Sequence, residues 1–140
     1  MGADNALKRT LALIAAALST AALGQQFVPY SYPKVTETQW LQYFEEVKAK
    51  HAATMRLPRD QHLAMLEDAA TKTSWVFTQP GHAAHPAWTT SRLTQSGGIT
   101  DIERNAFFVG DGRAFGTWYL TFLRLDDRKR QLARERREGK

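Results

Sequence analysis

Apolar residues recur with helical spacing in the first half of the chain. Between Thr36 and Met55 they fall at i, i+3, i+4, i+7 and i+11, as Trp40, Tyr43, Phe44, Val47 and His51. This spacing places them on one face and predicts an amphipathic helix. Pro58 breaks the pattern, and a second, shorter helix is predicted over residues 59–72, with one side formed by Leu63, Leu66 and Ala70. The two helices are expected to lie antiparallel around the turn at Pro58.

From Thr73 onward the pattern changes to β-branched and aromatic residues, which favour strands. Strands are predicted over residues 73–79, 87–94 and 99–108. The third segment also carries the helical capping signature Thr100-x-x-Glu103. The Gly97-Gly98 pair that precedes it is typical of a tight hairpin, so we favour a strand.

The strongest amphipathic pattern lies near the C-terminus. Asp111 is placed to cap a helix whose apolar stripe is formed by Phe115, Trp118, Tyr119, Phe122 and Leu125. The sequence therefore predicts an α+β fold with two N-terminal helices, a three-stranded antiparallel meander and a long C-terminal amphipathic helix. We expect helices to cover one face of the sheet and to leave the other partly exposed.

The N-terminal residues have the pattern of a secretory signal peptide. Lys8 and Arg9 precede an uncharged, mostly apolar run over residues 10–24, which ends in the small-x-small sequence Ala22-Leu23-Gly24. Cleavage after Gly24 would export the protein, with the periplasm as the expected compartment. A retained inner-membrane anchor through residues 10–24 is the alternative. The chain then divides into a signal peptide (1–24), an extended proline- and aromatic-rich arm (25–35), a single α+β domain (36–126) and a basic helical tail (127–140).

Composition and charge narrow the function classes. The 140 residues include no cysteine, which excludes a disulfide scaffold, thiol catalysis and thiolate metal sites. Over residues 25–123 nine basic and nine acidic residues cancel, whereas residues 124–140 hold eight basic against four acidic. Such a tail is typical of a solvated helix end, and nucleic acid is not expected as a partner outside the cytoplasm. The alternative is that the tail makes weak contact with an anionic membrane surface. The residues expected to make this contact are Arg128, Lys129, Arg130, Arg134, Arg136 and Arg137.

The most distinctive segment is the loop over residues 80–86, with the sequence Pro-Gly-His-Ala-Ala-His-Pro. Its two imidazoles, His82 and His85, stand three residues apart among small side chains. Together they could bind a divalent metal, with a third ligand from His51, His62, Glu67 or Asp68, and either one could act as a general base. The alternative is a rigid connection between strands, in which both histidines bond to backbone or solvent.

The stretch over residues 75–86, followed by a Gly-Gly hairpin and an aromatic helix, resembles small bacterial proteins of uncharacterised activity that bear a signal peptide and a PGHxAHP segment. The resemblance implies export and a strand–loop–strand–helix unit, and it assigns no catalytic residue. Since no coherent catalytic set is evident, we expect a small exported binding or accessory protein of the cell envelope, without a cofactor and with another envelope protein as partner. Its contacts are expected at His82, His85 and an exposed sheet face around Trp88. A metal-binding protein using His82 and His85 is the alternative function, and an enzyme is the third hypothesis.

Overall fold

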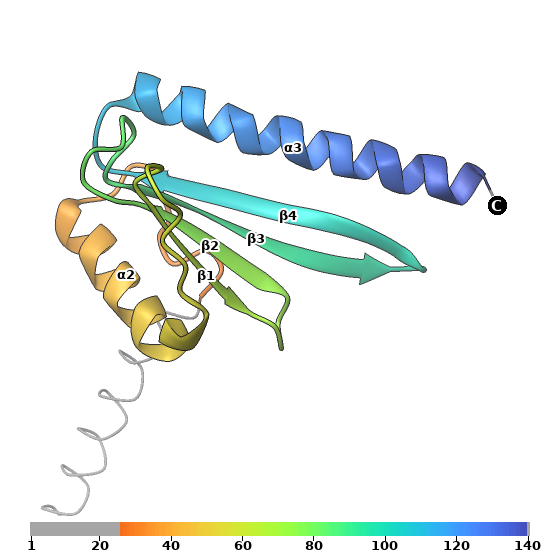
Figure 1. Cartoon of the computed structure of the whole chain (residues 1–140), viewed down its shortest axis with the longest axis horizontal. Coiled ribbons are helices and arrows are strands. Elements are labelled where there is room, and N and C mark those ends of the chain that lie inside the picture. Colours follow the sequence, from red (N-terminus) through yellow and green to blue (C-terminus); the bar gives the residue numbers. More distant parts are fainter. Residues whose placement is uncertain (1–25, 140) are drawn as a thin grey trace, which may run out of the picture.

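The computed structural model describes residues 26–139, so the predicted signal peptide lies outside the described part of the chain. Four antiparallel strands form one sheet in the order β1-β2-β3-β4, with bounds Leu63–Asp68, Thr73–Thr78, Ala87–Ser96 and Ile99–Phe108. Helix α2 (Glu37–His51), extended by a short 3-10 turn at Ala52–Thr54, packs on one face of the sheet. Helix α3 (Gly112–Glu138) runs along the other face, beside the long β3–β4 hairpin (Figure 1).

The predicted α+β class, the antiparallel meander and the long C-terminal helix are confirmed. Residues 99–108 form a strand that pairs with β3 along its whole length, so the helical capping signature within them is not used. The predicted cap of the last helix is present, because the Asp111 side chain accepts a hydrogen bond from the Arg113 N–H at 2.8 Å.

The predicted helix over residues 59–72 is wrong, and the sheet gains a fourth strand in its place. Residues 63–68 pair with β2, which places Ala64 and Leu66 in the core with the period of a strand. Leu, Ala, Met and Glu all favour helices, but pairing with the β-branched and aromatic strand that follows overrides this weak propensity. The backbone also turns away from a helix at both ends, since Asp60, His62 and Lys72 adopt positive φ.

The main core lies between α2 and the sheet. Alternate strand residues point toward the helix, and Trp88 is sandwiched between Tyr43 at 4.7 Å and Phe107 at 4.8 Å, measured between ring centroids. Buried aromatic and aliphatic side chains complete this layer, including Trp40, Phe44, Val47, Trp75 and Phe77. Aromatic rings supply most of the buried area, which is how a small domain without disulfides reaches stability.

The N-terminal arm lies across the same face beside α2 and is fixed by hydrogen bonds. The buried Tyr43 hydroxyl donates to the Gln26 carbonyl at 2.8 Å, and the Asn105 side chain donates to the Phe27 carbonyl at 2.6 Å. Farther along, Tyr30 packs edge-on against Trp88. The arm therefore covers the part of the core that α2 leaves open.

Both outer strands have their free edges partly covered. On β1, Met65 exchanges two backbone hydrogen bonds with Arg56, at 2.8 and 2.9 Å. On β4, the Phe108 N–H donates to the Pro33 carbonyl and its carbonyl accepts from the Val35 N–H, both at 2.9 Å. Strand edges that are occupied in this way offer fewer free backbone groups to another chain.

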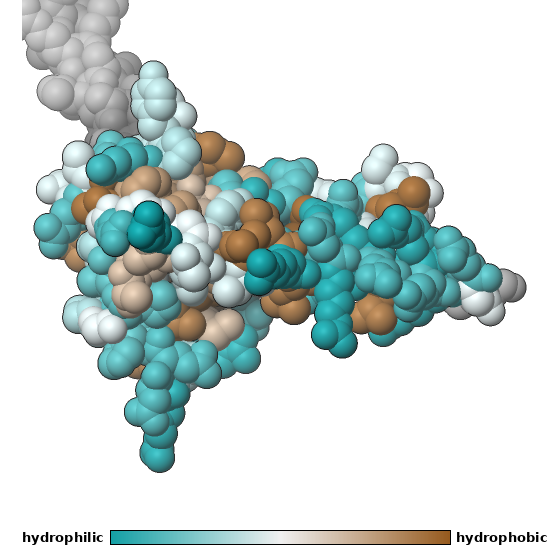
Figure 2. All heavy atoms as spheres, turned by 90° about the horizontal axis from the view of Figure 1, so that it is seen from above, coloured by the Kyte–Doolittle hydropathy of each residue, from teal (hydrophilic) through white to brown (hydrophobic). Residues whose placement is uncertain are grey.

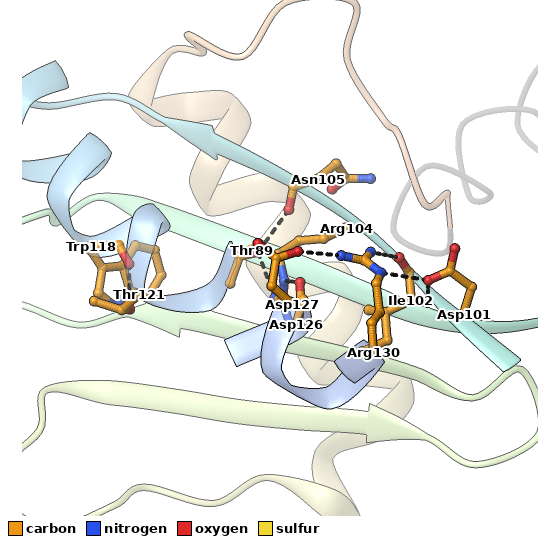
Figure 3. Close-up of polar contacts among 10 residues, drawn as sticks. All are labelled: Thr89, Asp101, Ile102, Arg104, Asn105, Trp118, Thr121, Asp126, Asp127 and Arg130. Carbon is orange, nitrogen blue, oxygen red and sulfur yellow. Dashed lines mark hydrogen bonds and ion pairs between the residues drawn. The ribbon is translucent and has the colours of Figure 1, made fainter. Parts of the chain in front are cut away.

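A buried ion pair holds the middle of α3 on the sheet (Figure 3). Arg104 of β4 donates to both carboxylate oxygens of Asp126, at 2.6 and 3.0 Å, and the two side chains are only 9% and 2% exposed. The same guanidinium donates to the Thr89 hydroxyl at 3.0 Å and lies over the Phe122 ring at 4.8 Å. Its charge is therefore satisfied on three sides within a layer that excludes water.

We predict that Asp126→Asn lowers the free energy of unfolding by about 3–5 kcal/mol, because it leaves the Arg104 charge buried without its counter-ion. Urea denaturation measures the change. Asp127→Asn is the matched control: its side chain is 78% exposed and pairs only with Arg130 within the described chain, so it should cost less than about 1 kcal/mol. Equal losses in the two variants would contradict the structural role of the buried pair.

Candidate functional site

The loop that carries both predicted histidines is built into the domain. The His85 Nδ1 lies 2.9 Å from the Thr78 hydroxyl, which also accepts the Ala87 N–H at 2.9 Å. The imidazole is edge-on to Trp40, whose indole N–H donates to the Ala87 carbonyl at 3.1 Å. His85 therefore ties the end of β2 to α2 and to the start of β3.

His82 stabilises the turn in which it lies. Its Nδ1 accepts the Ala84 N–H at 3.0 Å, and its ring is edge-on to Trp118 of α3. Because Nδ1 acts as an acceptor, the neutral ring carries its proton on Nε2. A metal at Nε2 would require that proton to move to Nδ1, which would break the hydrogen bond to Ala84.

The third ligands considered for a metal do not gather around the two histidines. Over residues 26–139 no group of three or more His, Asp or Glu side chains has a geometry that could hold a metal ion. His62 comes nearest, since its ring packs against Gly81 in the loop. His51 instead stacks on Trp75, at 5.0 Å between ring centroids, and lines a hollow together with Asp68.

Burial lowers the pKa of both loop histidines below the ordinary value of 6.5. For His82 the nearby His62 and His85 add to this effect, whereas for His85 a hydrogen bond at Thr78 opposes it. Both rings are therefore neutral at pH 7. Their neutrality suits the structural hydrogen bonds that they make.

Trp88, the third predicted contact residue, is fully buried with 0% of its surface exposed. The prediction that its ring lies on an exposed sheet face is therefore wrong. Because β-strand side chains alternate between faces, the register that directs Phe77 and Phe107 toward α2 directs Trp88 there as well.

A small hollow of about 100 Å³ at the β1–β2 turn brings together two of the candidate third ligands, His51 and Asp68, with side chains that were not predicted as site residues. These are Phe27, Thr71, Thr73, Trp75 and Arg92. Its charged groups already have partners. Asp68 accepts the Ala70 N–H and the Thr71 hydroxyl, which lowers its pKa, and Arg92 pairs with Glu103 at 2.7 Å. We therefore interpret these contacts as stabilising the β1–β2 turn and the neighbouring strands.

The most extended exposed feature is one face of α3. Five exposed residues follow one another at i, i+3, i+4, i+7 and i+11, so they share a face of the helix. We call them the basic stripe: Leu125, Arg128, Lys129, Leu132 and Arg136. Seen from above, hydrophilic and hydrophobic side chains alternate along this end of the molecule (Figure 2). Next to the stripe, a groove of about 360 Å³ is lined by Lys129 of α3 and by Ser74, Ser91 and Leu93 of the sheet, among others.

The basic stripe contains no acidic residue. The four acidic residues of α3 lie off it: Asp126 is neutralised by Arg104, and Asp127 and Glu135 line a neighbouring hollow together with Arg128 and Leu132. Arg130, one of the cations predicted to face a membrane, is held by Asp101 at 2.7 Å, by Asp127 at 3.1 Å and by the Ile102 carbonyl (Figure 3). Arg134 and Arg137 line a hollow beside Ile99 and Asp101, and Arg134 also lines one with Arg128 and Leu132. The stripe therefore contributes three of the exposed cations of α3, and one of them, Lys129, lines the groove.

Comparison with protein-family models, curated proteins and solved structures finds no match to the chain. The resemblance based on the PGHxAHP segment therefore stays a prediction. None of the helices within residues 26–139 combines the length and the apolar character needed to cross a membrane.

Gly81→Ala should destabilise the loop. Gly81 has φ of +101°, and a Cβ there would lie 3.0 Å from the His62 ring. We expect urea denaturation to show a loss of about 2–3 kcal/mol, from backbone strain and crowding together. Gly97→Ala is the control, because Gly97 has φ of +59° with open space around it and should cost only about 1 kcal/mol. The added loss at Gly81 should shrink when His62 is also replaced by Ala; an unchanged loss would exclude the contact.

Acid should weaken the fold through the loop histidines. Their pKa values are lower in the folded chain than the ordinary 6.5, so the unfolded chain binds protons first as the pH falls. The free energy of unfolding therefore decreases as the pH drops through 6.5 toward the folded-state values. Urea denaturation at a series of pH values should show a smaller decrease for His82→Gln/His85→Gln than for the unchanged protein. If the free energy of unfolding fell equally with pH in both proteins, the acid sensitivity would not come from His82 and His85.

Proposed function

We propose that the protein is a small exported binding protein that is attached to the cell envelope through the basic stripe of α3. It acts as an accessory protein, holding its partner without transforming a substrate. The loop histidines are used in hydrogen bonds that stabilise the fold, whereas the cations and leucines of the stripe are exposed. The proposed binding surface is therefore on α3.

The observation that carries the proposal is the separation of charge on α3. Asp126 is buried against Arg104, and Arg130 is occupied by Asp101 and Asp127, so the polar groups nearest the sheet are satisfied internally. Arg128, Lys129 and Arg136 face solvent and form no ion pair within the described residues. The anionic envelope surface outside the cytoplasm is a partner of opposite charge.

Fractionation of cells that make the full chain tests this proposal. We expect the protein outside the cytoplasm, with an N-terminus at residue 25, and associated with the envelope fraction. Arg128→Glu/Lys129→Glu/Arg136→Glu should release most of it into the soluble exported fraction, because the stripe then repels an anionic surface.

Lys50→Glu/Arg56→Glu/Arg59→Glu is the matched control, because it makes the same change in net charge at three exposed positions outside α3. This variant should stay largely with the envelope. Recovery of the protein in the cytoplasmic fraction would contradict export. Equal release of both variants, or release of neither, would contradict attachment through the stripe.

A further inference from the structure

We propose that the basic stripe binds the headgroups of an anionic phospholipid surface. This inference rests on the proposed attachment to the envelope and names the partner at the same surface. It requires the leucines of the stripe to enter the headgroup boundary while the neighbouring cations reach the lipid phosphates.

The stripe combines exposed leucines with neighbouring basic side chains. Leu125 and Leu132 are 45% and 44% exposed and lie seven residues apart, which is about two helical turns or roughly 10 Å along the axis. Arg128, Lys129 and Arg136 surround them. Long basic side chains can lay their alkyl stems on an apolar boundary and extend their charges to phosphate, as interfacial helices do.

The three cations of the stripe are not held in place by acidic partners within the described residues. Arg92, Arg104 and Arg130 are each fixed by an acidic partner at 2.6–2.7 Å. The three stripe cations form neither an ion pair nor a side-chain hydrogen bond with any residue from 26 to 139. Arginines at the centre of specific protein interfaces fit well-packed pockets, whereas a lipid surface requires only nearby positive charge.

The positive charge of the chain is concentrated in its last residues, 124–140. Residues 25–123 carry no net charge, so the excess at the end of α3 orients the whole domain toward an anionic plane. A second copy of the chain would bring the same three cations against the stripe and would be repelled. Lipid is therefore favoured over self-association.

Vesicle binding tests the proposal without any partner protein. The exported protein is mixed with vesicles of phosphatidylcholine and phosphatidylglycerol, or of phosphatidylcholine alone, and the bound fraction is measured by sedimentation. We expect binding only to the anionic vesicles, weakening as salt is added. Arg128→Glu/Lys129→Glu/Arg136→Glu should reduce the affinity at least about 100-fold, since each cation near such a surface contributes about fivefold.

Lys50→Glu/Arg56→Glu/Arg59→Glu should reduce the affinity less than about 10-fold, because these exposed cations lie outside α3 and away from the contact. Leu125→Ser/Leu132→Ser keeps every charge and should remove the binding that persists at high salt. Circular dichroism of each variant verifies that the domain is folded.

Equal losses in the two charge-reversal variants would overturn the role of the stripe, as would equal binding to both kinds of vesicle. No binding to anionic vesicles, combined with stripe-dependent envelope association in cells, would assign the stripe to a protein partner. That outcome would overturn the lipid inference and leave the proposed function intact. Loss of envelope association itself would overturn both.

Discussion

The ion pair between Arg104 and Asp126 determines where α3 lies. Without it, the helix would have aromatic contacts with the sheet only in its first turns, through Phe115 and Phe108. The pair fixes the helix at mid-length, and Arg130 then fixes it once more near the hairpin tip. An ion pair buried this deeply is costly to desolvate, so its geometry specifies a position more than it adds stability. The rotation of α3 about its axis follows from it, and so does the direction in which the basic stripe faces.

The same helix therefore presents two different surfaces. Toward the sheet, apolar rings alternate with paired charges. On the basic stripe, exposed cations that form no ion pair within the described residues alternate with leucines. Hydrophobic contacts are not directional, so the paired charges add the directional contacts that fix the rotation of the helix about its axis. The buried polar contacts make the proposed lipid contact a defined surface.

Much of the fold could be predicted because its signals are local. The helical period of Trp40 to Val47, the cap at Asp111 and the glycine pair between β3 and β4 each indicate their element within a few residues. The strand over residues 63–68 could not be predicted in this way, because its residues favour a helix and only pairing with β2 reveals its period. Trp88 was misplaced for a related reason: the face it occupies depends on the register of a sheet whose strand number was wrong.

The site was harder to predict than the fold. The His82/His85 loop is conspicuous in sequence, yet the rings bond to Ala84 and Thr78, partners that spacing does not show. The basic tail was visible as composition, but sequence could not separate Arg130 from its neighbours. Its partner Asp101 lies 29 residues away along the chain, and only the tertiary structure brings the two together.

The partly covered edges of the outer strands matter if the protein binds to a membrane surface. Adsorption to a membrane would raise the local concentration of the protein, and exposed strands would then be prone to add to one another. In this protein the backbone of Arg56 pairs with the β1 edge at Met65, and the N-terminal arm pairs with the β4 edge at Phe108. These two segments should therefore hinder edge-to-edge pairing at Met65 and Phe108 when copies crowd together on a lipid plane.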